Sequence, residues 1–206
     1  MITTFVTHKF TKEERETVKE CAEFVSKVRV KIPIYDVSKV TDSDQSKFNK
    51  ELHTRTTSSF VETRRVEAMF KSKSALTHSY TIQPLVSMDG TLHSPMLVVL
   101  QESKGKFGGR VAQTTKRPPN LALKAAKSHI VTKKIVQDWF INQYFPVADD
   151  KSLLLVDALP EYKDRSIVNT LEPESAAYDM TIIPKGGTKY VQPLDVLFFA
   201  SMEKIC

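Results

Sequence analysis

The sequence predicts a single α/β domain with a mixed central sheet flanked by helices. Two β-rich runs, 80–88 and 95–100, follow each other along the chain, and the continuous apolar run 153–156 is typical of a strand buried on both faces. Segments with helical spacing precede and follow these strands. With 206 residues, of which 41% are hydrophobic and 26% charged, the chain can form one core and is too apolar for a disordered polypeptide.

The first predicted element is an amphipathic helix over 11–28. Thr11 and Glu14 form a capping box at its start, and Pro33 follows its end. One face is apolar, at helical spacing: Val18, Cys21, Ala22, Val25 and Val28. We assign residues 1–34 to a helical appendage and residues 35–206 to the main domain.

The next segments are predicted to be strands. A short strand runs through Val37 and Val40 into the acidic run 41–46, and three neighbouring antiparallel strands are expected over 66–70, 80–88 and 95–100. Asp89-Gly90 predicts a hairpin turn between the last two. Pro84 predicts an interruption or bulge in the middle strand. Neither Asp42 nor Asp89 is expected to do more than form a turn.

The second half alternates helices and strands. A mobile loop is predicted over 102–120. A helix over 131–145 follows, with Trp139 on its apolar, core-facing side. The buried strand 153–156 ends on Asp157. After it we expect a short helix at about 163–170, a strand over 180–183, and a last helix that begins near Pro193 and carries Asp195 in its first turn.

Three aspartates fall where an α/β sheet presents side chains to one crevice. Asp44 ends the first strand, Asp157 ends the buried strand, and Asp195 starts the last helix. Carboxylates are the ligands that Mg²⁺ and Mn²⁺ require, and two such ions support phosphoryl transfer. Taken singly, each aspartate is also explained as a turn cap, a strand end or a helix N-terminal charge. Their joint placement favours the metal site.

The sequence around these residues resembles a known family. The run 153–157 followed by 182–196, which contains Gln192-Pro193-Leu194-Asp195, is similar to the DDE superfamily endonuclease domain of pogo/jerky/tigger-type transposases. Those proteins carry a hydrophobic strand ending in Asp and then an I-P…Q-P-L-D segment. The run 41–49 is similar to their first strand, which ends in N-x-D-Q-S-G-F or N-x-D-E-T. The resemblance covers about 35–206.

The resemblance implies an RNase H-like fold and metal-dependent DNA strand cleavage and transfer. Asp44, Asp157 and Asp195 would be the catalytic residues and the ligands of Mg²⁺ or Mn²⁺. DNA would be the partner and the nucleus the location, and homo-oligomerisation stays open. The resemblance also implies that the chain is clipped within the last core helix.

The departures from the family support a second function. Ala158 stands where the family often has Asn or Ser, so a side chain that could orient Asp157 is missing at that position. Lys47 replaces the family's glycine after Q-S. The alternative is a catalytically dead, co-opted transposase remnant that acts as a nucleic-acid-binding or protein-interaction module.

The charge and cysteine content limit the partners and the compartment. A net charge of +6 and a pI near 9.2 make a polyanion a plausible partner. Two cysteines are too few for a disulfide framework, which indicates a reducing compartment, and no apolar run approaches the length of a membrane span. Five basic residues in the 104–117 loop are candidates for contacts with the DNA backbone, although a merely solvated loop is equally compatible: Lys104, Lys106, Arg110, Lys116 and Arg117.

Overall fold

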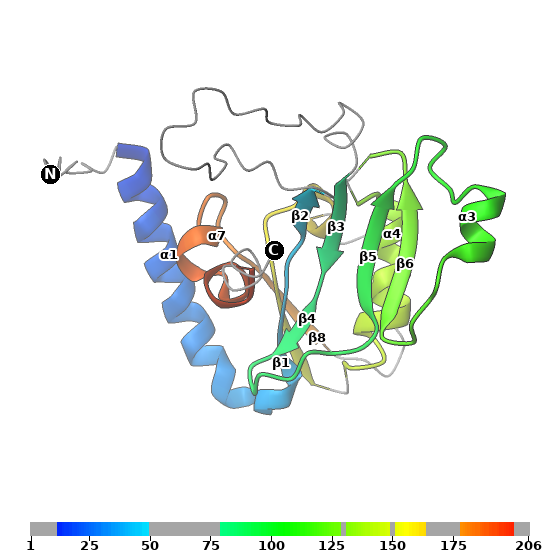
Figure 1. The fold of residues 1–206 in the computed structure, drawn as a ribbon. Helices are drawn as coiled ribbons and strands as arrows, with labels where there is room; N and C mark the ends of the chain where they lie inside the picture. The colour runs from blue at the N-terminus through cyan, green and yellow to red at the C-terminus, as the bar shows by residue number, and fades with distance from the viewer. Residues whose placement is uncertain (1–11, 50–78, 129–130, 149–150, 164–177, 200–206) are drawn as a thin grey trace, which may run out of the picture.

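The computed structural model describes residues 12–49, 79–128, 131–148, 151–163 and 178–199 (Figure 1). These residues form two mixed four-stranded sheets flanked by helices, which confirms the predicted α/β class. The strand predicted over 66–70 lies outside the described residues, as does nearly all of the helix predicted at 163–170. No helix in the described part is long and apolar enough to span a membrane.

Helix α1 (Lys12–Lys31) confirms the first predicted helix and continues three residues beyond it. Glutamates occupy its first turn and basic residues its last turn, as the helix dipole favours. Two 3₁₀ turns follow, η1 (Ile32–Ile34) and η2 (Val37–Lys39). The strand predicted through Val37 therefore begins only at Val40, because the Asp36 side chain accepts a hydrogen bond from the Ser38 backbone N–H and starts a helical turn instead.

The first sheet has the strand order β4-β1-β7-β8. Its strands are β1 (Val40–Ser43), β4 (Leu85–Ser87), β7 (Ser152–Val156) and β8 (Tyr178–Ile182). Strand β1 pairs antiparallel with β4 and parallel with β7, and β7 pairs parallel with β8. Every residue of β7 is buried, as the continuous apolar run predicts.

The second sheet has the strand order β2-β3-β5-β6. Its strands are β2 (Ser46–Asn49), β3 (Ser79–Gln83), β5 (Met96–Gln101) and β6 (Leu121–Ala126). The last pair is parallel and the other two are antiparallel.

The two sheets are joined by a pair of strands that passes through both. β1 continues into β2, and β3 continues into β4 across Pro84. The pairing register is the same on both sides of this interruption, since Ser43 faces Leu85 and Ser46 faces Ile82. Gln45 therefore lies opposite Gln83, and Asp44 lies opposite Pro84, which has no backbone N–H to donate to the ladder.

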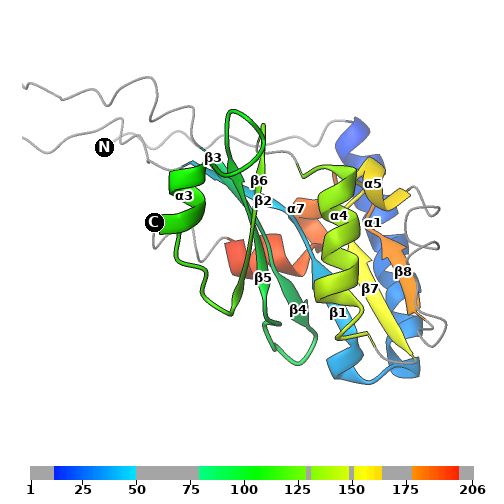
Figure 2. The same ribbon diagram turned by 90° about the vertical axis from the view of Figure 1, so that its right-hand side faces the viewer.

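The loop predicted over 102–120 is partly helical. Helix α3 (Gly109–Thr114) lies within it, and strand β6, which the sequence pattern did not predict, follows. The Arg117 guanidinium lies over the Phe107 ring at 5.8 Å, so the segment also has internal contacts. Figures 1 and 2 show that the segment between β5 and β6, residues 102–120, projects from the edge of the second sheet; we call this segment the excursion.

Helices cover both faces of the sheets (Figure 2). Helix α4 (Lys133–Trp139) continues directly into the π-helical turn η3 (Phe140–Tyr144), and together they confirm the helix predicted over 131–145. Trp139 is fully buried in the core, as predicted. The fully buried side chains of this face pack on alternate residues of β7: Val136, Trp139, Phe140 and Tyr144 against Leu154 and Val156.

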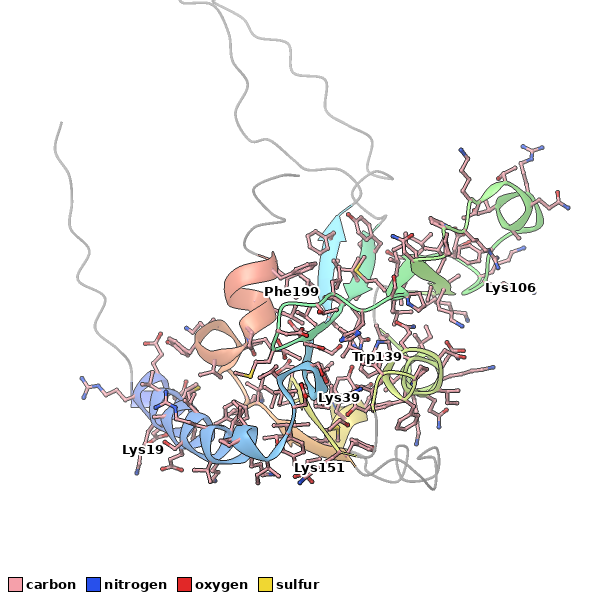
Figure 3. The ribbon with its side chains drawn as sticks, turned by 90° about the horizontal axis from the view of Figure 1, so that it is seen from below. Lys19, Lys39, Lys106, Trp139, Lys151 and Phe199 are labelled. Atoms are coloured by element: carbon pink, nitrogen blue, oxygen red, sulfur yellow. The ribbon has the colours of Figure 1, made fainter. Side chains whose placement is uncertain are left out.

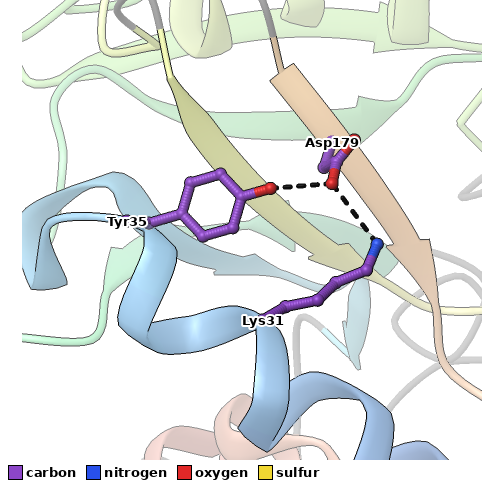
Figure 4. A network of polar contacts seen from close by, with 3 residues as sticks. All are labelled: Lys31, Tyr35 and Asp179. Carbon is purple, nitrogen blue, oxygen red and sulfur yellow. Dashed lines mark hydrogen bonds and ion pairs between the residues drawn. The ribbon is translucent and has the colours of Figure 1, made fainter.

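Helix α1 packs on the other face, where Phe24 and Val28 meet Leu153 and Leu155 of β7. Figure 4 shows a polar contact that joins the end of this helical segment to β8: Asp179 accepts hydrogen bonds from the Tyr35 hydroxyl at 2.7 Å and from the Lys31 amine at 3.3 Å. The contact ties the N-terminal helix to the edge strand of the sheet.

The chain after β8 forms two short helical turns, and the second begins next to Pro193, where the sequence predicts the last helix. The first is α7 (Thr188–Val191) and the second is the π-helical turn η4 (Leu194–Phe199). Short helix α5 (Pro160–Lys163) lies between β7 and β8 in the chain.

Candidate active site

Asp44 lies at the interruption between β1 and β2 and is buried. Asp157 directly follows β7, the parallel neighbour of β1. Because Ser43 and Val156 are register partners, Asp44 and Asp157 occupy the next position on two adjacent strands. Parallel strands end at the same edge of a sheet, so this pairing brings two carboxyl groups from distant parts of the sequence together.

Asp195 reaches the same region from the first turn of η4. The pKa of Asp44 is raised to about 8, mainly by burial and further by the charges of Asp195, Asp157 and Asp42. The charges of the other two predicted aspartates thus act on Asp44, which places all three in one electrostatic neighbourhood. Their role as metal ligands stays a prediction.

Asp157 is oriented by groups that the sequence pattern did not identify. Its Oδ1 accepts hydrogen bonds from the Ala158 backbone N–H at 2.6 Å and from the Thr188 hydroxyl at 3.4 Å. The side chain expected at position 158 is thus replaced by the backbone of that residue and by a hydroxyl from α7. Outer groups of this kind fix the direction of a carboxylate oxygen.

Asp42 is not the turn residue that the sequence predicts. It lies within β1, is buried, and accepts hydrogen bonds from the Gln192 side-chain amide at 2.7 Å and the Leu194 backbone N–H at 3.1 Å. Burial raises its pKa to about 7. The sequence does contain one signal that Asp42 lies near the site. Asp42 is two residues from Asp44, and residues two apart in a strand face the same side of the sheet.

Asp89 is a turn residue, as predicted. Its side chain accepts a hydrogen bond from the Thr91 backbone N–H at 2.9 Å, and Gly90 has a φ of 88°, a conformation that favours glycine.

A buried polar network supports the loop after Asp44. The side-chain amide of Gln83 donates to the Tyr162 hydroxyl at 2.7 Å and to the Ser43 hydroxyl at 3.3 Å. Gln45 donates to Gln83 Oε1 at 3.2 Å. Tyr162 is 1% exposed, so the network joins α5, β1 and β3 in a place that water does not reach.

The predicted DNA-contacting residues lie apart from the aspartates in the fold. All five are exposed and belong to the excursion between β5 and β6: Lys104, Lys106, Arg110, Lys116 and Arg117. In Figure 3, Lys106 lies at the outer end of this excursion, on the opposite side of the molecule from Lys19 of α1. Their contact with DNA stays a prediction.

A lysine-rich groove adjoins the base of this excursion. It has a volume of about 760 Å³ and lies between the β5–β6 connection and α4. Exposed Lys104, Lys127 and Lys134 line it, together with Lys124, which forms an ion pair with Asp138 at 2.7 Å. The groove therefore carries a surplus of positive charge.

The three aspartates offer only carboxylate oxygens, which suit Mg²⁺ and Mn²⁺. Within the described residues, no basic side chain forms an ion pair with Asp44 or Asp157, so the protein does not neutralise their charge there. The donor set thus fits a divalent cation. As the described side chains stand, however, no three Asp, Glu, His or Cys residues are grouped closely enough to hold a metal ion.

A protein-family model matches the chain. The model described as "DDE superfamily endonuclease" matches residues 86–205, which is more than half of the chain and includes Asp157 and Asp195. None of the curated proteins compared with the chain matches it.

Solved structures of Mos1 transposase are similar in fold. A Mos1 paired-end complex with the left transposon end has a TM-score of 0.56 at 13% identity, and a Mos1 strand transfer complex has 0.58 at 12%. A Mos1 mariner paired-end complex with Mn has 0.58 at 14%. Each match covers 100% of this chain and 51–52% of the Mos1 chain, so this chain spans about half the length of those proteins. The likeness confirms the RNase H-like fold class.

Proposed function

Because the chain belongs to the DDE superfamily endonuclease family, we propose that it carries out metal-dependent DNA strand cleavage and transfer. Asp44, Asp157 and Asp195 are the proposed catalytic ligands. The observation that carries the proposal is the register of β1 and β7: Ser43 pairs with Val156, so Asp44 and Asp157 follow at the same edge of two parallel strands. In agreement with this, the charges of Asp195 and Asp157 both raise the pKa of buried Asp44. Carboxylates that repel one another at one edge of a sheet are stabilised together by a cation.

Mg²⁺ or Mn²⁺ is the proposed cofactor. When bound, a pair of such ions activates water and stabilises the leaving oxygen of a phosphodiester. Two of the similar Mos1 structures are complexes with Mn and with Mg. The donor chemistry of Asp44, Asp157 and Asp195 supports the same choice for this chain.

The surrounding residues would hold these ligands in place. The Ala158 backbone N–H and the Thr188 hydroxyl fix one oxygen of Asp157. Burial fixes Asp44, and the hydrogen bonds of Gln45 and Gln83 support the loop after it. When the ligands are already oriented, less free energy is needed to rearrange them as the ion binds.

DNA is the proposed partner and the nucleus the proposed location. The five basic residues of the 104–117 segment and the lysine-rich groove beside it would contact the phosphate backbone. Their exposure and the net charge of +6 support this, because backbone contacts are made by accessible Lys and Arg side chains.

The test is a nicking assay on supercoiled plasmid with Mg²⁺ or Mn²⁺. Wild-type protein should nick the plasmid only with the ion. Asp157→Asn should lose the activity, although its Oδ1 can still accept the hydrogen bonds from the Ala158 backbone N–H and the Thr188 hydroxyl. Asp36→Asn is the matched control, since Asp36 is exposed and Asn caps a helical turn equally well. Nicking by Asp157→Asn at the wild-type rate would refute the proposal.

One observation favours a second function, a catalytically inactive module that binds nucleic acid or protein. No three potential ligands in the described residues stand grouped for a metal ion. An inactive module would bind DNA in a salt-dependent way, show no nicking with either ion, and show no change in stability when the ion is added.

A further inference from the structure

Asp42 joins two segments that are 150 residues apart in the sequence. One carboxylate oxygen accepts a hydrogen bond from Gln192 Nε2 at 2.7 Å, and the other accepts one from the Leu194 backbone N–H at 3.1 Å. Asp42 is 6% exposed, Gln192 0% and Leu194 2%. The carboxylate therefore holds both ends of the Gln192–Leu194 segment in a place that excludes competing water.

The segment held in this way leads directly into a proposed ligand. Asp195 follows Leu194 in the chain and lies in the first turn of η4. Pro193, between the two anchored residues, restricts the backbone dihedral φ and leaves the segment little freedom of its own. Fixing Gln192 and the Leu194 N–H therefore fixes where the η4 turn starts, and with it the position of the Asp195 backbone.

The contact with Gln192 does not depend on a carboxylate at position 42. Gln192 Oε1 is buried and has no hydrogen-bond partner among the described residues. If the Gln192 amide is turned over, this oxygen can accept a hydrogen bond from an amide group at position 42, while the amide oxygen there still accepts from Leu194 N–H. The segment can thus be held by asparagine as well as by aspartate.

We infer that Asp42 is a positioning residue for Asp195: it clamps the Gln192–Leu194 segment through hydrogen bonds and is not itself a metal ligand. The expected effect of Asp42 on metal binding rests on the proposed function. The clamp itself is a statement about the fold and can be measured without any metal.

The experiment compares Asp42→Asn with Asp42→Ala in the full chain. The first readout, without metal, is hydrogen exchange at the Leu194 amide followed by NMR. Exchange should stay slow in Asp42→Asn and become at least tenfold faster in Asp42→Ala, because only alanine lacks an acceptor. If Asp42→Ala does not fold, Gln192→Met provides the second variant for the affinity measurement below. It keeps the length of the side chain and removes the donor to Asp42, so it should weaken Mn²⁺ binding, and unchanged affinity would overturn the positioning role.

The second readout is the Mn²⁺ affinity measured by calorimetry. Loss of a residue that orients a ligand typically costs 10–100-fold in metal affinity, so Asp42→Ala should weaken Mn²⁺ binding by about that factor. Asp42→Asn should bind within about threefold of wild type. Tyr35→Phe is the stability control, because it removes the hydrogen bond to Asp179 on the edge strand β8 and should leave the affinity unchanged.

The outcomes separate this inference from the proposed function. Absence of Mn²⁺ binding by the wild type would refute the proposed function, and the exchange rates would still decide whether Asp42 is a clamp. Unchanged Leu194 exchange in Asp42→Ala would overturn the clamp. Equal loss of affinity in Asp42→Asn and Asp42→Ala would overturn the positioning role, because the carboxylate charge itself would then be required.

Discussion

The side-chain amide of Gln83 donates a 2.7 Å hydrogen bond to the hydroxyl of Tyr162, and both residues are buried. Gln83 lies in β3 and Tyr162 in α5, 79 positions apart in the chain. Gln45, which follows Asp44, bonds to both of them, at 3.2 and 3.4 Å. The loop that carries Asp44 is therefore supported by a contact between two elements that are otherwise separate in the sequence.

Tyr162→Phe should destabilise the fold. It removes the hydroxyl and leaves the buried Gln83 amide with a 3.3 Å bond to Ser43, so the free energy of unfolding should fall by about 1–3 kcal/mol. Urea unfolding measures the change. Tyr35→Phe is the matched control, since it also removes a 2.7 Å hydrogen bond, but Asp179 is exposed and can bond to water instead. Equal losses in the two variants would contradict the role of burial.

Without metal, the protein should become less stable as the pH rises from about 4 to about 8. In the folded state burial raises the pKa of Asp42 from 3.8 to about 7 and that of Asp44 from 3.8 to about 8. The folded state holds these protons in that interval and the unfolded chain does not, so the free energy of unfolding decreases with pH. Thermal unfolding at pH 5 and pH 8 measures it, and Asp42→Asn should make the decrease shallower. A melting temperature that rises over this interval would contradict the prediction.

Mg²⁺ should raise the melting temperature, and Asp157→Asn should abolish that shift. An ion that binds only the folded state stabilises it by about 2.7 kcal/mol at a hundredfold excess over Kd. In the metal-free protein the same substitution should raise the melting temperature, because the charge of Asp157 disfavours ionised Asp44. Differential scanning calorimetry tests both effects, with Asp36→Asn as control. A Mg²⁺ shift that survives in Asp157→Asn would exclude Asp157 as a ligand.

The lysine-rich groove should contribute to DNA binding without sequence preference. The paired change Lys127→Gln and Lys134→Gln should weaken binding to all duplexes alike, and the slope of log K against log salt should become shallower by about 0.9 for each lost phosphate contact. The matched control is Lys19→Gln with Lys27→Gln on α1, on the other side of the molecule from the excursion (Figure 3). Equal weakening by the control pair would show that net charge alone is responsible.

The excursion residues can be tested in the same way. Replacing Lys104, Lys106 and Arg110 with Ala should weaken binding to specific and random duplexes by the same factor. Competition between labelled duplexes measures it. If this chain bound one duplex more than about 1,000-fold tighter than random DNA, the binding would be sequence-specific and the prediction wrong.

The parts of the fold that the sequence predicted are those with local patterns. The apolar run 153–156 identified the buried strand, helical spacing identified Trp139 as a core residue, and the acid at the end of each element identified Asp44 and Asp157. Each of these signals can be recognised from a few neighbouring residues, without knowledge of the partners that they meet in the fold. The structure adds the register that sets the two acids side by side.

The parts that the sequence did not predict depend on distant partners. The sequence predicts only a turn at Asp42, because no neighbouring residue indicates its hydrogen bond with Gln192. Thr188 was not identified as a partner of Asp157 for the same reason. Strand β6 (Leu121–Ala126) has little apolar alternation, and it forms because β5 offers a free edge for parallel pairing.

The segments β1–β2 and β3–β4 keep one pairing register across both sheets, and this limits where residues can be inserted or deleted. Inserting one residue between Ser43 and Ser46 would reverse the side on which every following side chain of β2 lies, because strand side chains alternate. Phe48, which stacks on Tyr80 at 5.7 Å, would leave that ring. An insertion of two residues would restore the alternation and still separate Gln45 from Gln83. The segment between β1 and β2 is therefore closed to insertions and deletions.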